Sequence, residues 1–162
     1  FSFTLFSAHL KSRVPGPAAD QSELRLEEAK ILREHIDAKL KAAPEANIIA
    51  VGDFNDSPNS KPLKNLVGRG KFALIDTRPT EKNQDGSGNF PEPRIKPRTV
   101  AWTHFYATED SYSRIDYILI SPAMAKYWMR AETFIPQIPD WGIGSDHRLI
   151  VATFDTALQT QH

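Results

Sequence analysis

The feature that most limits how this chain can fold is a short apolar run that ends abruptly in a polar segment. Residues Ile48–Val51 follow one another without the polar alternation of a half-exposed strand. Such a run is typical of a strand buried on both faces, so we expect a layered structure around Asn47–Val51. We expect this strand to break at Gly52, and the turn-rich segment Asp53–Asn59 to follow it.

The other predicted elements surround this strand. Apolar residues recur at helical spacing over Gln21–Ala42, which indicates an amphipathic surface helix with Asp20 at its start and Pro44 after its end. Further strands are expected at Phe1–Phe6, Phe72–Asp76, Val100–Phe105, Arg114–Ser121, Met129–Ile135 and Arg148–Phe154. Short helices are expected at Ser60–Val67 and Pro122–Lys126, a turn at Thr108–Ser113, and loops at Lys11–Ala19, Arg78–Arg98 and Pro136–Ser145. This mixture is typical of an α/β or α+β layered sheet.

Composition excludes several kinds of chemistry. The 162 residues contain no cysteine, so disulfides, thiolate nucleophiles and cysteine-bound metals are excluded. The 20 basic residues equal the 20 acidic ones, so a phosphate ester must be bound by a local site and not by bulk charge. No apolar run approaches the roughly 20 residues of a membrane span, and no phosphate-binding loop, zinc-binding H-E-x-x-H or serine-hydrolase G-x-S-x-G motif is present.

Polar residues gather where the predicted strands end. Asp53 and Asn55 are two residues apart, so in extended backbone they share a face, where a carboxylate could accept a proton from water beside an amide. The alternative is that both only satisfy a turn. Asp116 lies inside an apolar strand, where a carboxylate needs a partner. That partner is a histidine or arginine, and a structural ion pair with Arg114 is the simpler alternative.

Two histidines lie in similar polar segments. His147 follows Asp146, and an imidazole oriented by a carboxylate can bind a phosphoryl oxygen. His9 follows the first strand. Taken alone, each is more often a structural or merely exposed histidine, and the role of His104 is open. With only oxygen and imidazole ligands available, Mg²⁺ or Mn²⁺ is the expected metal.

Four segments in order carry a resemblance: Ser7–Ser12, Gly52–Asn55, Arg114–Ile118 and Ser145–Leu149. Together they resemble the endonuclease/exonuclease/phosphatase superfamily, which includes deoxyribonucleases, abasic-site endonucleases, inositol polyphosphate 5-phosphatases and bacterial sphingomyelinases. The resemblance spans residues 1 to about 154. It implies an α/β fold, a deoxyribonuclease-like two-sheet β-sandwich flanked by helices, with the site at one end of the sheets.

The resemblance also implies a role for each matching residue. Asp53 resembles the base that activates water, and Asn55 the residue that orients this water and contacts the phosphate. Asp116 resembles the partner of the catalytic imidazole, which is His147. His9 resembles a second histidine near the leaving group. The implied metal residues are Asp146, Asp53 and Asn55, and the implied ion is Mg²⁺, with Mn²⁺ as an alternative.

The chain departs from the family in one respect. Nothing in it matches the half that normally supplies an Asn and the main metal-binding Glu. We therefore expect residues 1–155 to be the C-terminal portion of the domain, lacking its N-terminal part, and residues 156–162 to be a tail. A missing N-terminal segment or a second copy would complete the fold and cover a large apolar face. We also expect weak Mg²⁺ affinity.

The substrate is less constrained than the reaction. Trp102 could stack on a nucleic-acid base or pack in the core, and Arg114 is the other candidate substrate-binding residue. The loop Arg78–Arg98 has a mild basic excess, which suits an anionic substrate or a solvated loop. The sequence thus predicts a metal-dependent phosphoesterase, either a nuclease or a lipid or sugar phosphatase. The alternative is a non-catalytic fragment or binding module that keeps the fold without turnover.

Overall fold

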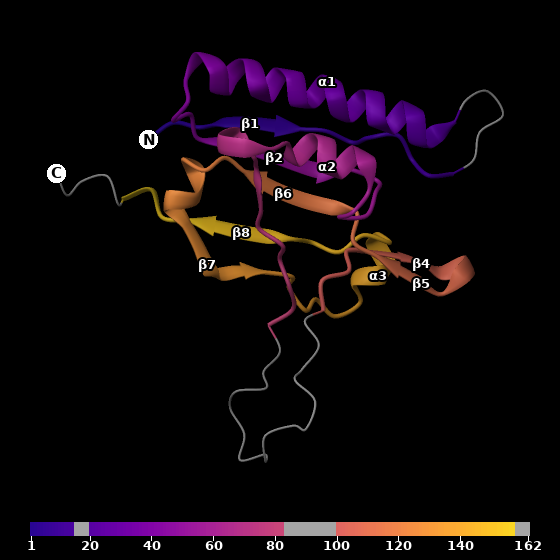
Figure 1. Cartoon of the computed structure of the whole chain (residues 1–162). Coiled ribbons are helices and arrows are strands. Elements are labelled where there is room, and N and C mark those ends of the chain that lie inside the picture. Colours follow the sequence, from indigo (N-terminus) through magenta and orange to yellow (C-terminus); the bar gives the residue numbers. More distant parts are fainter. Residues whose placement is uncertain (15–19, 83–99, 158–162) are drawn as a thin grey trace, which may run out of the picture.

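The computed structural model of the chain describes residues 1–14, 20–82 and 100–157 (Figure 1). Much of the two expected loops, Lys11–Ala19 and Arg78–Arg98, lies outside the described residues, as do residues 158–162 of the expected tail. Within the described part, no helix is both long and apolar enough to cross a lipid bilayer.

A four-stranded sheet forms the centre of the molecule. Its strands are β1 (Thr4–Ser7), β2 (Ile48–Asp53), β6 (Asp116–Ile120) and β3 (Ile75–Asp76), in the order β1-β2-β6-β3. β1 runs parallel to β2, and β6 runs antiparallel to both β2 and β3. Residues Ile48, Ile49 and Ala50 of β2 are buried, as the unbroken apolar run predicts.

The prediction that β2 breaks at Gly52 is wrong, because the strand continues to Asp53. Gly52 has φ of 143°, and a Cβ atom there would lie 1.8 Å from the carbonyl oxygen of Ala8. The glycine therefore allows the end of β1 to pass close to β2 without ending the strand. The extra residues carry Asp53 onto the sheet, directly opposite Asp116 of β6.

Two helices cover one face of this sheet. α1 (Gln21–Ala42) has the predicted bounds, and the Asp20 carboxylate accepts a hydrogen bond from the Ser22 N–H at its start. α2 (Lys61–Val67) begins after Ser60, whose hydroxyl accepts from the Leu63 N–H. Both helices lie on the side of the sheet away from β7 and β8 (Figure 1). The core between helices and sheet includes Ala29, Ile36, Leu40, Leu63, Leu66, Ile48 and Leu119.

A two-stranded sheet packs on the other face. β7 (Trp128–Phe134) and β8 (Val151–Phe154) pair antiparallel. A second buried cluster of Ile49, Ile118, Ile120 and Met124 contacts Trp128, Ile150 and Phe154. The arrangement agrees with the expected layered α/β fold, since β-structure lies on one side of the central sheet and helices on the other.

Smaller elements differ from the predictions. A third sheet pairs β4 (His104–Tyr106) with β5 (Ser111–Ser113), where one longer strand and a turn were expected. The expected strand Phe72–Asp76 begins as a 3₁₀ turn at Gly70–Phe72 and is a strand only at Ile75–Asp76. The expected helical turn near Pro122–Lys126 is a 3₁₀ turn at Met124–Tyr127, and the expected loop Pro136–Ser145 contains α3 (Trp141–Gly144).

One part of the sheet surface is apolar and exposed. Phe1, Phe3 and Leu5, in and just before edge strand β1, each expose more than half of their surface. They occupy alternate positions, so they share one face of the extended chain. The exposed apolar surface of the central sheet therefore lies along its edge strand β1, outside the area that β7 and β8 contact.

Candidate active site

Three side chains from separate segments meet at one end of the central sheet. Asp53 ends β2 and Asp116 begins β6, and the two residues are direct partners across the strands. His147, which precedes β8, places Nδ1 2.9 Å from Asp116 Oδ2 and Nε2 3.8 Å from Asp53 Oδ2. The sheet register thus brings together the two carboxylates and the imidazole that the sequence singles out.

Asp116 does not pair with Arg114, which was the simpler alternative. The Arg114 guanidinium donates to both carboxylate oxygens of Asp76, at 3.1 and 2.6 Å, and lies over the Tyr117 ring. These contacts hold the Arg114 guanidinium on Asp76 and not beside the imidazole. The expected contact of Arg114 with substrate stays a prediction. The partner of Asp116 is instead the histidine.

A buried threonine fixes the position of Asp116. The Thr103 side chain is 1% exposed, and its Oγ1 accepts hydrogen bonds from the Ile115 and Asp116 N–H groups, both at 3.1 Å. Both backbone N–H groups at the start of β6 are thereby hydrogen-bonded, which fixes the backbone that carries the Asp116 carboxylate. Nothing in the sequence distinguishes Thr103 from other strand threonines, and sequence reasoning missed it.

Asp53 has one oxygen bound and one facing the imidazoles. Its Oδ1 accepts from the Asn55 N–H at 2.8 Å, while Oδ2 lies 3.6 Å from Nε2 of His9. Burial raises the pKa of Asp53, and the charge of Asp116 raises it further, whereas the Asn55 N–H and the two histidines act in the opposite direction. A carboxylate with a raised pKa accepts a proton more readily than an ordinary aspartate.

Asn55 connects the segments that follow β1 and β2. It has φ of 52°, a conformation that asparagine tolerates better than most residues, and it is buried. Its Nδ2 donates to the Leu10 carbonyl at 2.9 Å, and its own carbonyl accepts from Arg13 Nε at 2.8 Å. Asn55 therefore does stabilise the turn after β2, as the alternative interpretation of this segment proposes. The expected contact of Asn55 with phosphate stays a prediction.

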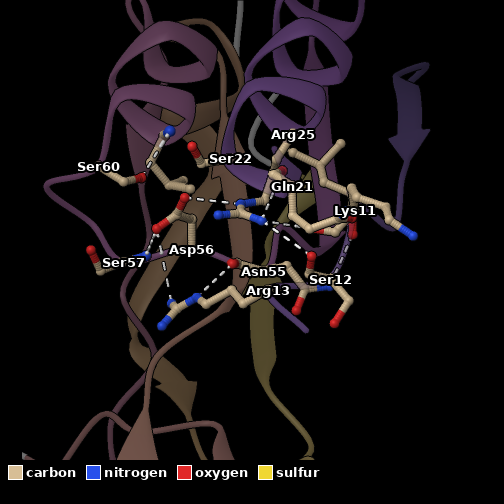
Figure 2. Close-up of polar contacts among 12 residues, drawn as sticks. Lys11, Ser12, Arg13, Gln21, Ser22, Arg25, Asn55, Asp56, Ser57 and Ser60 are labelled. Atoms are coloured by element: carbon tan, nitrogen blue, oxygen red, sulfur yellow. Dashed lines mark hydrogen bonds and ion pairs between the residues drawn. The ribbon is translucent and has the colours of Figure 1, made fainter. Parts of the chain in front are cut away.

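An arginine on α1 holds these segments in place (Figure 2). Arg25 is 5% exposed; its Nε donates to Asp56 Oδ2 at 2.9 Å, and its Nη1 donates to the carbonyls of Lys11 and Ser12. The guanidinium thus joins the segment after β1 to the segment after β2. The helical pattern of α1 gave no reason to expect a buried arginine at this position.

A second imidazole–carboxylate pair lies next to His147. His104 Nε2 lies 3.4 Å from Asp146 Oδ2, and the ring centroids of His104 and His147 are 4.7 Å apart. Within the described residues, two groups of potential metal ligands share His147: one with Asp53 and Asp116, and one with His104 and Asp146. The predicted metal residues Asp53 and Asp146 fall into different groups.

Trp102 belongs to an aromatic cluster near His104. Its ring lies 4.9 Å from that of Tyr112 and 5.3 Å from that of Trp141, and the Arg148 guanidinium lies 4.0 Å from its centre. Arg148 is itself buried and pairs with Glu81. Packing accounts for these contacts, and stacking of Trp102 on a base stays a prediction.

Comparison with known proteins gives a family match and a set of similar folds. The model of the Endonuclease/Exonuclease/phosphatase family matches residues 6–147. No curated protein matches the chain. A 3′ phosphatase from Neisseria, solved with a product DNA hairpin, aligns over 93% of this chain at 16% identity and a TM-score of 0.58. A mannosyl-6-phosphatase from Bacteroides thetaiotaomicron aligns over 95% at 18% identity and a TM-score of 0.50. This chain spans 60% and 52% of those two structures, respectively.

Proposed function

The chain belongs to the endonuclease/exonuclease/phosphatase family, and we propose that the protein containing it hydrolyses phosphate esters at the Asp53–Asp116–His147 site. The observation that carries this proposal is the position of the His147 imidazole between two carboxylates on adjacent strand ends. The family's members act on phosphate esters, and this arrangement supplies the proton acceptor and the oxyanion-binding group that such a reaction needs.

His147 is proposed to bind the phosphate. With Nδ1–H donated to Asp116 at 2.9 Å, the ring is held in one orientation and Nε2 faces the space beside Asp53. When it is protonated, the imidazole donates from Nε2 to a phosphoryl oxygen as negative charge develops there, while Asp116 holds the ring through Nδ1.

Asp53 is proposed to activate the attacking water. Its Oδ2 accepts the proton while the water oxygen forms a bond to phosphorus and the bond from phosphorus to the leaving oxygen breaks. The hydrogen bond from Asn55 to Oδ1 keeps the other oxygen turned toward His9 and His147. His9, whose side chain is 73% exposed, is free to protonate the leaving oxygen.

A divalent cation, Mg²⁺ or Mn²⁺, is part of the proposal. Asp53 is a suitable ligand, since its carboxylate is half-buried beside a second carboxylate, and burial together with that neighbouring charge raises its pKa. When bound, the cation supplies positive charge that stabilises the phosphoryl oxygens. Asn55 and Asp146 remain the other proposed ligands.

The substrate is proposed to be a phosphomonoester or phosphodiester. Release of p-nitrophenol from bis-p-nitrophenyl phosphate and from p-nitrophenyl phosphate separates the two, and plasmid DNA and inositol phosphates extend the test to biological substrates. We expect turnover that depends on Mg²⁺ or Mn²⁺, stops with EDTA and is abolished by His147→Ala. His35→Ala, which removes an exposed histidine from α1, is the control.

The second candidate is a binding module that keeps the fold without turnover. It is favoured by the fact that the chain spans only 60% of the similar 3′ phosphatase structure. An absence of hydrolysis on every substrate, for a preparation that still binds inorganic phosphate, would support this candidate. Turnover that survives His147→Ala would refute the proposed mechanism.

A further inference from the structure

We propose that His104, Asp146 and His147 form a binding site for a transition-metal ion of the zinc type. Each of these residues offers one ligand atom, and the three atoms lie within 4.8 Å of one another. The group shares His147 with the oxygen-rich group of Asp53 and Asp116. Zinc binding can be measured without turnover, but zinc here would occupy the His147 Nε2 that is proposed to donate to the phosphate, so zinc and phosphate would compete for that atom.

Backbone pairing places the two histidines together. His104 and His147 are cross-strand partners in an isolated antiparallel bridge, supported by hydrogen bonds from Phe105 N–H to the Asp146 carbonyl and from Arg148 N–H to the Thr103 carbonyl. Partners in such a bridge point their side chains to the same face. The two rings therefore meet because of the register of the backbone.

Each imidazole has a second partner that orients it for metal binding. Nδ1 of His147 lies 2.9 Å from Asp116 Oδ2, and Nδ1 of His104 lies 3.4 Å from Ser113 Oγ. Metal-binding histidines commonly donate one ring N–H to a carboxylate or another oxygen, which leaves the lone pair of the other nitrogen for the metal. In both histidines an oxygen lies next to Nδ1, so that Nε2 is the nitrogen left to bind a metal.

The spacing of the ligand atoms suits a tetrahedral ion. His104 Nε2 and Asp146 Oδ2 are 3.4 Å apart. Two ligands bonded at about 2.0 Å to a tetrahedral ion are separated by about 3.3 Å. The other distances in the group are at most 4.8 Å, so these ligand atoms must move closer together to bind one ion.

The chemistry of the three ligands selects the ion. Two imidazoles and one carboxylate favour Zn²⁺ or Co²⁺, whereas Mg²⁺ prefers oxygen ligands and an octahedral shell. Asp146 is 67% exposed, so an ion can enter from solvent and keep a water molecule as its fourth ligand. We therefore expect zinc to bind here even when magnesium is in large excess.

The test is calorimetric titration of the chain with Zn²⁺ in millimolar Mg²⁺. We expect one site, at least a tenfold loss of affinity in His104→Gln and in Asp146→Asn, and no change in His35→Ala. Asp116→Asn should reduce affinity by about tenfold, because it removes the oxygen that orients His147. Binding of Co²⁺ should produce visible absorption bands of tetrahedral intensity, and His104→Gln should remove them.

Two results would overturn the proposal. One is the absence of zinc binding by the wild-type chain. The other is binding that Asp53→Asn weakens and that neither His104→Gln nor Asp146→Asn affects, since this result assigns the ion to the Asp53–Asp116–His147 group. Asp146 is exposed, so its substitution leaves the fold intact and keeps the test decisive if the His104 variant is unstable.

Discussion

Two imidazole–carboxylate pairs lie side by side in this molecule and differ in how they are held. In the inner pair, His147 and Asp116, the contact is 2.9 Å and the carboxylate is 16% exposed. In the outer pair, His104 and Asp146, the contact is 3.4 Å and the carboxylate is 67% exposed. The inner carboxylate begins a central strand and is fixed through Thr103, whereas the outer one lies in the segment before β8. The same two residue types therefore give a rigid, oriented imidazole in one place and an open ligand pair in the other.

The largest difference is expected in catalysis. Asp116→Asn removes the carboxylate that orients His147. We expect kcat for phosphate-ester hydrolysis to fall by about 10⁴-fold, as it does when the orienting carboxylate of a Ser-His-Asp triad is replaced by an amide. Asp146→Asn should lower it less, by about tenfold, because this exposed carboxylate is only one of several proposed metal ligands. Steady-state rates of both variants under the same conditions measure the difference, and equal losses would contradict the contrast between the two pairs.

The contrast between buried and exposed ion pairs can also be tested at Arg25, which Figure 2 shows. Arg25→Met removes the closer of the two arginines that pair with the half-buried Asp56 carboxylate and leaves Arg13 at 4.0 Å. We expect a loss of about 3 kcal/mol in the free energy of unfolding. The matched control is Lys126→Met, which breaks the exposed ion pair with Glu45 and should cost less than about 1 kcal/mol. Urea denaturation of the two variants gives both values, and equal losses would show that burial does not decide the effect.

Thr103→Val tests what makes the inner pair rigid. It removes the oxygen that accepts from two backbone N–H groups in the interior, and we expect a loss of about 2 kcal/mol in unfolding free energy. Thr77→Val is the control, because the Ile118 carbonyl that its hydroxyl contacts still accepts from the Thr77 N–H. Its cost should be about 1 kcal/mol or less. A Thr103 effect no larger than that of Thr77 would mean that Asp116 is held in another way.

The smallest expected effect is a gain in stability. Because the pKa of Asp53 is raised in the folded state, its ionised form destabilises the fold above that pKa, and the cost disappears as the pH falls through it. Asp53→Asn should therefore stabilise the protein at neutral pH, and this gain should vanish in acid. The opposite sign is expected for Asp20→Asn, since hydrogen bonds from Ser22 lower the pKa of Asp20. Thermal unfolding from acid to neutral pH distinguishes these outcomes.

Local patterns predicted the parts of the fold that depend on local sequence. The 22 residues of α1 were predictable because their apolar residues recur at helical spacing between Asp20 and Pro44. The buried strand β2 was predictable because its apolar run has no alternation. Its end was not, because Gly52 continues the strand only through the close approach of Ala8, which is remote in sequence.

The site shows the same division. Asp53, Asp116 and His147 could be identified from polar residues at strand ends and from the family resemblance. His104, Thr103 and Arg25 could not, because their importance depends on which segments lie beside them. The bridge between residues 104 and 147, and the contacts of Arg25 with the segments after β1 and β2, are properties of tertiary structure alone.

The most direct test of the central claim is a titration of the chain with inorganic phosphate, followed by NMR of the histidine side chains. If His147 is the imidazole that binds the substrate's phosphoryl group, its ring signals shift and saturate as phosphate is added, while those of His35 do not move. The same shift should be lost in Asp116→Asn, where the ring is no longer oriented. A His147 signal that responds no more than that of His35 would contradict the account.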